Sequence, residues 1–481
     1  MAYVRKVKTK SGAIAVQVVT KSGGRIVDLT HVGSAHSEEE LGILMALAKD
    51  RLHRNQLSLF SGSSRPLAIK LKQSTSQLLS RVLQKQYQAL GFGQLDDPDF
   101  ALLCIARMVE PTSKLDSLRV LSDLGITGVT KDRLYRCLGR IETGNYRDLI
   151  QQVCFAAAAK EALTLVLYDV TTLYFEIQKE DGYRKPGLSK ERRLEPQIVV
   201  GLLVDKTGFP LSVQSFEGNT AETKTILPVL KAFQTKHHLQ NITVVADAAM
   251  MSWKNLEALA DSGYTYIVGS RLTKVPYALA EYQENSQLTD NQVLVEKRSG
   301  YRIIYQYKQK RASLDSKNLE KQVAKAERVV EGKAQTHRCR FVTINARKNR
   351  LNLNLIEKAR ALVGIKGYVT NVDIPNDQVI ATYHQLFQVE ASFRMSKSDL
   401  KARPIFHHKK EAIEAHLTIV LAALAIGRRI ESKTKISLKQ LINILKPIRS
   451  GTIVLNGREY SVQEEIPEDI HILLKKLNSG H

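Results

Sequence analysis

The sequence predicts an α/β protein built around a mixed β-sheet. Short apolar runs rich in leucine and β-branched residues occur at 163–167, 198–204, 211–216 and 242–246, and each run suits a buried strand. The turn DKTG joins the second and third runs into a hairpin, and a helical pattern at 220–236 precedes the fourth. Strands and helices that follow one another in this way are typical of an α/β sheet.

Two of these strands end on an aspartate. Asp169 follows the run at 163–167, and Asp247 follows the run at 242–246. A single aspartate at a strand end is most simply a turn or capping residue, although a buried carboxylate needs its charge compensated. With the first strand central and the fourth beside it, the two carboxylates would meet at one edge of the sheet. This strand order is that of a ribonuclease H-like core.

A third acid lies on a helix that is predicted to follow Asp377. Tyr383, Glu390 and Lys397 are seven residues apart, so they share one helix face with a drift of only ~20° per step. Arg394, four residues after Glu390, lies near the same face. An exposed face with incidental charges would give the same pattern. A glutamate that follows two strand-end aspartates nevertheless favours a shared site.

The charge balance indicates a polyanionic partner. The 481 residues include 71 Lys and Arg against 48 Asp and Glu, which gives a net charge of +23. Such an excess favours nucleic acid, because basic side chains neutralise phosphates and release counterions. The longest apolar run, 417–426, is about half of the ~20 residues that a membrane span needs. The first residues lack the apolar core of a signal peptide, and the four cysteines form no CxxC pair, so we expect a cytoplasmic, nucleoid-associated protein.

Acids in a basic protein suit phosphodiester chemistry. The three carboxylates would bind two Mg²⁺ or Mn²⁺ ions, which in such sites lie ~3.5–4 Å apart and act on the attacking and leaving oxygens. Hard divalent cations prefer oxygen ligands. Lys397 and Arg394 would neutralise the DNA phosphate, and Tyr383 could donate a hydrogen bond to it. The predicted catalytic and metal-binding residues are therefore Asp169, Asp247 and Glu390.

Composition and periodicity divide the chain into six regions. They are a β-meander followed by a helix at 1–72, a helical DNA-binding region at 73–158, the first part of the ribonuclease H-like core at 159–272, a β-rich basic insertion at 273–362, the second part of the core with the glutamate helix at 363–432, and a C-terminal tail at 433–481. In the first region Ser37 and Glu40 have the spacing of a capping box.

Basic residues outside the acids are candidates for DNA contacts. Arg133 and Arg136 lie on a helix that begins at Thr130 and could be the second helix of a helix-turn-helix, although an ordinary helical hairpin with a solvated basic face explains them equally well. Lys190 and Arg192 lie in a basic loop, and Arg302 lies among interleaved tyrosines in the insertion. That interleaving suits a grip on a DNA strand, and a solvated basic surface is the alternative.

Three histidines follow the glutamate helix. His407, His408 and His416 are close enough in sequence to suggest a metal cluster. A surface loop and a buried helix face are the simpler interpretation.

The acids lie in blocks that resemble a known family. YDVTTLYFE, VVADAAMMS and YHQLFQVEASFRMSKSDLKARPIFHH resemble, in order, the three catalytic blocks of the DDE transposases of bacterial insertion sequences. The most similar branch has a tyrosine-arginine-glutamate-lysine signature on the last helix and a β-rich insertion before it. Asp169, Asp247 and Glu390 match its metal-binding triad, but Leu386 stands at the position of the signature's arginine.

The resemblance implies a transposase that cuts the ends of an insertion sequence and joins them to target DNA. It further implies action on double-stranded DNA as a homodimer in a synaptic complex. Two alternatives remain at the level of sequence: a ribonuclease H-fold nuclease that cuts without joining, and a DNA-binding relic of a transposase without catalytic activity.

Overall fold

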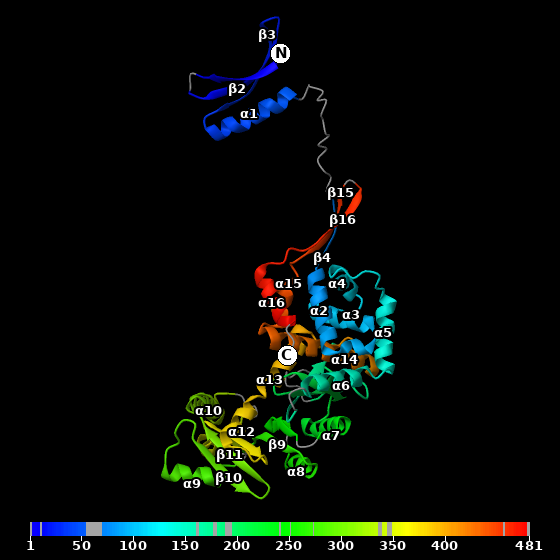
Figure 1. Cartoon of the computed structure of the whole chain (residues 1–481). Coiled ribbons are helices and arrows are strands. Elements are labelled where there is room, and N and C mark those ends of the chain that lie inside the picture. The colour runs from blue at the N-terminus through cyan, green and yellow to red at the C-terminus, as the bar shows by residue number, and fades with distance from the viewer. Residues whose placement is uncertain are drawn as a thin grey trace. The chain divides into compact units, whose positions relative to one another are not determined.

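The structure of the chain is a computed structural model (Figure 1). It describes residues 2–9, 12–53, 70–159, 163–176, 180–187, 195–239, 242–250, 252–272, 274–334, 339–343, 349–455 and 457–478. The chain divides into two compact units. One comprises residues 1–71 with 453–460, and the other comprises residues 72–452 with 461–481.

The first unit contains an antiparallel meander and one helix. Its elements are β1 (Ala2–Lys8), β2 (Ile14–Ser22), β3 (Arg25–Ala35) and α1 (Glu38–His53), with the strands in the order β1-β2-β3. The Ser37 cap of the predicted capping box is present at the start of α1, but the Glu40 carboxylate bonds one residue before Ser37. The Ser37 hydroxyl accepts from the Glu40 backbone N–H at 3.2 Å, and the Glu40 carboxylate accepts from the His36 backbone N–H at 2.8 Å.

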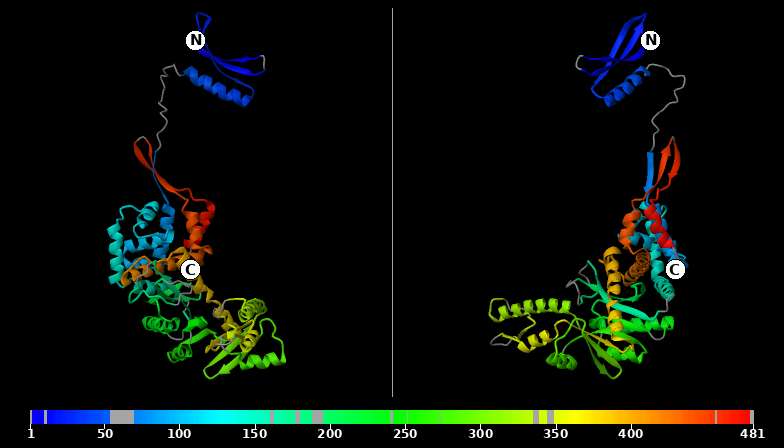
Figure 2. Two further views of the ribbon diagram at one scale, coloured as in Figure 1. Left: turned by 180° about the vertical axis from the view of Figure 1, so that it is seen from behind. Right: turned by 60° about the vertical axis from the view of Figure 1, so that its left-hand side comes forward.

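The second unit begins with a group of helices. They are α2 (Gln77–Leu90), α3 (Pro98–Val109), α4 (Ser117–Asp123), α5 (Lys131–Thr143) and α6 (Tyr146–Ala159). Thr130 caps α5 as expected, because its hydroxyl accepts from the Arg133 backbone N–H. Helix α14 (Lys410–Thr434) comes from much later in the chain and packs against α3, α5 and α6 (Figures 1 and 2).

A mixed sheet of eight strands follows these helices in the same unit. Its strands are β5 (Leu165–Tyr174), β6 (Gln197–Asp205), β7 (Pro210–Glu217), β8 (Thr243–Ala246), β9 (Thr265–Ser270), β10 (Val293–Arg298), β11 (Tyr301–Tyr307) and β14 (Ile365–Thr370). They lie in the order β10-β11-β14-β9-β8-β5-β6-β7. Strand β5 is parallel to β8 and antiparallel to β6, and β8 is parallel to β9. The segment β7-β6-β5-β8-β9 therefore has the arrangement expected of a ribonuclease H-like core.

Both faces of this sheet are buried. Val166 and Tyr168 of β5 pack in a cluster with α7 (Ile226–His237) and α8 (Trp253–Asp261). Leu167 and Leu173 of the same strand point the opposite way, into a cluster that includes α12 (Asn376–His384), α13 (Phe387–Arg394) and α14. This alternation explains why apolar residues of β5 occur on both sides of the strand, as a strand covered on both faces requires.

The region 273–362 differs from the expected β-rich insertion. Strands β10 and β11 do not form a separate sheet. Strand β11 pairs with β14, with Arg302 opposite Thr370 at one end and Tyr307 opposite Ile365 at the other, and so extends the central sheet. The rest of the region is largely helical. Its other elements are α9 (Tyr277–Asn285), α10 (Gln309–Val330), β12 (Val342–Thr343), β13 (Arg350–Leu351) and α11 (Leu353–Ala361).

The C-terminal part adds two helices and two strands. These are α15 (Leu438–Leu445), β15 (Ser450–Leu455), β16 (Arg458–Val462) and α16 (Glu468–Asn478), and the two strands form a sheet with β4 (Lys70–Thr75) in the order β16-β15-β4. Within the described ranges, every helix is too short or too polar to span a bilayer.

Candidate active site

Strand register brings the two predicted aspartates together. Tyr168 of β5 is the partner of Ala246 in the parallel strand β8, so the next residues, Asp169 and Asp247, lie at matching positions. Asp247 follows the end of β8 as predicted, but Asp169 is not at a strand end, because β5 continues to Tyr174 through its pairing with β6. Neighbouring strands lie ~4.8 Å apart. Alternation also places both aspartates on the face that is covered by α12, α13 and α14. The carboxylates of Asp169 and Asp247 therefore lie on neighbouring strands, on the face of the sheet that α12, α13 and α14 cover.

The third acid faces the same space. A cavity of about 320 Å³ is lined by both aspartates and by Glu390 of α13. Asp169 is half-buried, whereas the side chains of Asp247 and Glu390 are exposed. The remaining lining residues are Lys366, Tyr383, His384, Leu386, Phe387 and Val389. The structure thus brings together the three acids that the sequence singled out.

Tyr383 reaches Asp247 through a gap that a glycine leaves open. Its hydroxyl donates to Asp247 Oδ1 at 3.2 Å, and the same oxygen accepts from the Ala248 backbone N–H at 2.7 Å. A Cβ atom on Gly269 would lie 2.6 Å from the Tyr383 hydroxyl oxygen and 3.2 Å from Ala248 Cβ. Burial and the Asp247 charge raise the pKa of Tyr383, so the phenol remains a donor at neutral pH.

Helix α13, which carries Glu390, is fixed to the turn between β6 and β7. The buried Ser392 hydroxyl donates to the Gly208 carbonyl at 2.6 Å. Arg428 of α14 donates to Gln388 Oε1 at 2.7 Å and also to the Thr207 carbonyl. Hydrogen bonds on either side of Glu390 therefore hold its helix against the sheet.

Lys366 is a residue of this site that the sequence analysis missed. It lies on β14 and lines the cavity, with its ammonium 4.4 Å from the centre of the Tyr383 ring and 5.6 Å from that of Tyr368. Burial lowers its pKa, as does Arg311, while the nearby Asp247 and Glu390 act in the opposite direction. A lysine at the start of an otherwise apolar strand was the one available signal in the sequence.

The signature helix is not the single continuous helix that the seven-residue spacing predicts. Helix α12 ends at His384, α13 begins at Phe387, and a π-helical turn, Met395–Asp399, follows α13. Tyr383 and Glu390 still face one cavity. Lys397 lies in the π-helical turn and lines a separate small pocket under α14, because the wider turn rotates it away from the α13 face.

The other predicted phosphate contacts lie outside the cavity. Arg394 is exposed at the end of α13, and Leu386, at the signature's arginine position, is buried in the cavity wall. Arg302 is largely buried and donates to the Ile374 carbonyl, with Asp373 at 3.9 Å. Of Arg394 and Arg302, only Arg394 is therefore exposed to solvent.

Some of the basic side chains of α5 form ion pairs within the protein. Arg133 donates to Asp99 at 2.6 Å, whereas Arg136 is exposed and donates to the Asp132 carbonyl at 3.3 Å. Lys190 and Arg192 lie outside the described residues.

The donor set of the cavity fits a hard divalent cation in its chemistry. All three acids supply carboxylate oxygens, the ligand type that Mg²⁺ and Mn²⁺ prefer, and the cavity has room for bound water. In the part of the chain that the structure describes, no three His, Cys, Asp or Glu side chains are gathered around one point where an ion would bind. Metal binding would therefore require the carboxylates to turn toward one another within the cavity they already share.

Comparison with protein families decides the assignment. The family described as "Transposase DDE domain" matches residues 161–426, which is more than half of the chain and includes all three acids. The chain belongs to this DDE transposase family. A comparison with curated protein sequences finds no significant match.

Two solved transposase structures show weak similarity to this DDE transposase. One is the cryo-EM structure of the piggyBac transposase synaptic complex with hairpin DNA, with 11% sequence identity and a TM-score of 0.43, covering 76% of each chain. The other is the Mos1 transposase paired-end complex with the left transposon end, with 9% identity and a TM-score of 0.17, covering 33% of this chain and 54% of that one.

Proposed function

We propose that this DDE transposase cleaves DNA at the ends of a mobile element and transfers the freed strands into target DNA, in a cut-and-paste reaction. The element would be a bacterial insertion sequence, and the active species a homodimer that holds two DNA ends. The observation that carries the proposal is the shared cavity of Asp169, Asp247 and Glu390, reached from two adjacent parallel strands and one helix.

The three acids would hold two Mg²⁺ or Mn²⁺ ions. When bound, such ions supply activation of an attacking oxygen and stabilisation of a leaving oxygen in an in-line displacement. Tyr383 would orient the Asp247 carboxylate through its hydrogen bond, as outer residues commonly do for metal ligands. Ser392 and Arg428 would fix Glu390 by fixing α13.

The basic surroundings would position the DNA. Lys366 offers a cation inside the cavity, where it would contact the backbone phosphate beside the scissile bond. Exposed Arg394, Arg136 and the overall charge of +23 would hold the flanking duplex. Lys397, Arg302, Arg133, Lys190 and Arg192 remain predictions for the same contacts.

The test is a strand-transfer assay with labelled duplexes that carry the inverted repeats flanking the gene. Wild-type protein with Mg²⁺ should nick these ends and join them to a target plasmid. Asp169→Asn, Asp247→Asn and Glu390→Gln should each abolish both steps and keep duplex affinity. The matched control is Asp377→Asn, which removes an exposed acid of α12 that does not line the cavity and should leave both steps intact.

The assay separates the proposal from its alternatives. Hydrolysis of the ends without joined product would favour a ribonuclease H-fold nuclease. Equal activity of Asp247→Asn and the wild type would remove the carboxylate cavity from the mechanism. Binding without any cleavage by the wild type would favour a DNA-binding relic. Sedimentation of the protein with and without paired ends tests the homodimer.

A further inference from the structure

A second cluster of titratable side chains lies between α3 and α14, outside the lining of the carboxylate cavity. Arg107 lies in the last turn of α3, and Lys114 follows that helix before α4. His407 precedes α14, and His416 lies within it. Residues about 300 positions apart in the sequence thus form one basic cluster, which we call the α3–α14 basic cluster.

These side chains are buried without a compensating acid. The exposed fractions are 9% for Arg107, 7% for Lys114 and 4% for His416. Among the described residues, no hydrogen bond or ion pair reaches the guanidinium of Arg107 or the ammonium of Lys114. Charged groups are rarely buried in this way unless they are paired, because desolvation costs several kcal/mol per ion.

The histidines show the same lack of partners. The two imidazole rings lie 5.7 Å apart. His416 Nε2 lies 3.1 Å from the Ala402 carbonyl, but its buried Nδ1 has no hydrogen-bond partner. Because Nε2 must carry the proton to donate to that carbonyl, the unpartnered Nδ1 is an acceptor, and the donors of the cluster are the two cations.

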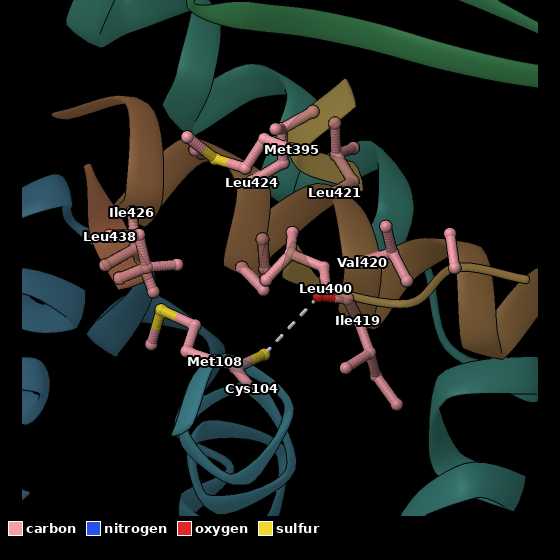
Figure 3. Close-up of a cluster of buried hydrophobic side chains, with 14 of the residues drawn as sticks. Cys104, Met108, Met395, Leu400, Ile419, Val420, Leu421, Leu424, Ile426 and Leu438 are labelled. Atoms are coloured by element: carbon pink, nitrogen blue, oxygen red, sulfur yellow. Dashed lines mark hydrogen bonds between the residues drawn. The ribbon is translucent and has the colours of Figure 1, made fainter. Parts of the chain in front are cut away.

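The walls around the cluster are apolar. Helix α3 packs on α14, and Figure 3 shows Cys104 and Met108 of α3 close to Ile419 and other core side chains of α14. The Cys104 thiol donates to the Ile419 carbonyl at 4.0 Å. Low polarity strengthens the attraction between these cations and an anion, which offsets the cost of removing both from water.

The pKa values reflect mutual repulsion. Burial and then Arg107 lower the pKa of Lys114 to about 7. Burial and then Lys114 and Arg107 lower the pKa of His407 to about 4, and the same groups lower that of His416 well below its ordinary value. Other titratable groups near the cluster are His408, which further lowers the pKa of His407, and the Cys104 thiol, whose pKa burial raises. Within the described parts of the chain, no acid is among the groups that act on Arg107, Lys114 or the two histidines.

We propose that the α3–α14 basic cluster is a binding site for a phosphoryl group. A guanidinium supplies paired N–H donors for phosphate oxygens, and an ammonium supplies a compact charge. A metal ion, which the three histidines suggest in the sequence, does not suit the site, because Arg107 and Lys114 would repel it and no carboxylate is present. The phosphoryl group would come from a DNA backbone or from free inorganic phosphate.

Thermal unfolding of the full chain tests the proposal. Inorganic phosphate should raise the Tm of the wild type above its value in chloride of equal ionic strength. Lys114→Met should lose that phosphate-dependent rise, and in phosphate-free buffer it should be more stable than the wild type because it no longer buries an unpaired charge. Lys85→Met is the control, since it removes the same charge from the exposed face of α2 and should keep the rise.

The Tm data can also overturn the proposal. If phosphate raises the Tm of Lys114→Met as much as that of Lys85→Met, the effect is general salting and the site does not bind phosphate. Should Lys114→Met fail to fold, ³¹P NMR of inorganic phosphate with wild type and Lys85→Met gives the answer. Line broadening that saturates at one phosphate per chain supports the site, and sharp lines at every ratio refute it.

A duplex-binding measurement identifies the source of the phosphoryl group. If DNA supplies it, Lys114→Met should weaken duplex binding and reduce the slope of log affinity against log salt by about 1, and inorganic phosphate should compete. If free phosphate is the ligand, duplex binding should be unchanged while the Tm rise is lost. Unchanged duplex binding together with an unchanged Tm rise would end the proposal. None of these readouts requires DNA cleavage.

Discussion

Replacing Gly269 by alanine tests whether the approach of Tyr383 to Asp247 is needed for DNA cleavage. The added Cβ would lie 2.6 Å from the Tyr383 hydroxyl oxygen, which is closer than real Cβ contacts allow. Since the next atoms, in Ala248, lie at 3.2 Å, the phenol is the group that must move. It would then leave Asp247 Oδ1, to which it donates at 3.2 Å.

The size of the effect follows from that lost contact. A hydrogen bond to a charged group contributes ~1.5–3 kcal/mol, and loss of an outer hydrogen bond to a metal ligand typically costs about 10- to 100-fold in activity or metal affinity. Tyr383→Phe should therefore reduce cleavage about 10- to 100-fold and raise the Mg²⁺ concentration needed. Gly269→Ala should match this loss and cost a further ~1–3 kcal/mol of stability through overpacking.

The double variant gives the decisive comparison. In Tyr383→Phe the hydroxyl that meets the new Cβ is absent, so adding Gly269→Ala should cost much less activity than it costs alone. Cleavage of a labelled element end over a range of Mg²⁺ concentrations measures all four proteins. Fully additive losses, or a wild-type rate for Gly269→Ala alone, would refute the role given to this contact.

Three further predictions concern charge, anchoring and pH. Lys366→Met should reduce nicking about tenfold or more in the labelled-end assay and leave the Tm unchanged or higher, because the lysine is partly buried without a close ion pair. Ser392→Ala removes the 2.6 Å bond to Gly208, and calorimetry should show ~1 kcal/mol less stability while cleavage falls with the displaced Glu390. Burial alone would raise the pKa of Asp97, but hydrogen bonds, including one from Arg140, lower it from 3.8 to about 2. The ionised carboxylate therefore contributes ~2 kcal/mol of stability above pH 4, and this contribution should disappear as the pH falls to 2. Asp97→Asn should flatten that pH dependence in urea titrations.

Local patterns in the sequence were sufficient to predict much of this fold. The cap at Ser37, the helix start at Thr130 and the strand that ends before Asp247 all depend on a few neighbouring residues, and the structure has them where they were expected. Asp169, which was expected at a strand end, lies instead within β5, because pairing with the distant strand β6 extends β5 to Tyr174. The three acids could be selected because each follows or lies on a strongly periodic segment. Their common cavity is consistent with that selection, while their catalytic roles remain a proposal.

The features that sequence could not supply depend on long-range pairing. Arg302 and Thr370 are register partners although 68 positions separate them, and this pairing carries β10 and β11 into the central sheet. The same pairing positions β14 and so brings Lys366 to the acids. The breaks on either side of α13 arise from packing on the β6–β7 turn, which a seven-residue repeat does not reveal.

The burial of α14 limits how this protein can be shortened. The family match ends at residue 426, inside a helix whose buried side chains continue to Ile430 and Thr434. A catalytic fragment cut at that point would lose Arg428, which holds Gln388, and would also lose Leu438, so the apolar core residues that pack with Leu438 would be uncovered. Expression of a minimal catalytic region should therefore extend at least through α15, and shorter fragments are expected to aggregate through the newly opened surface.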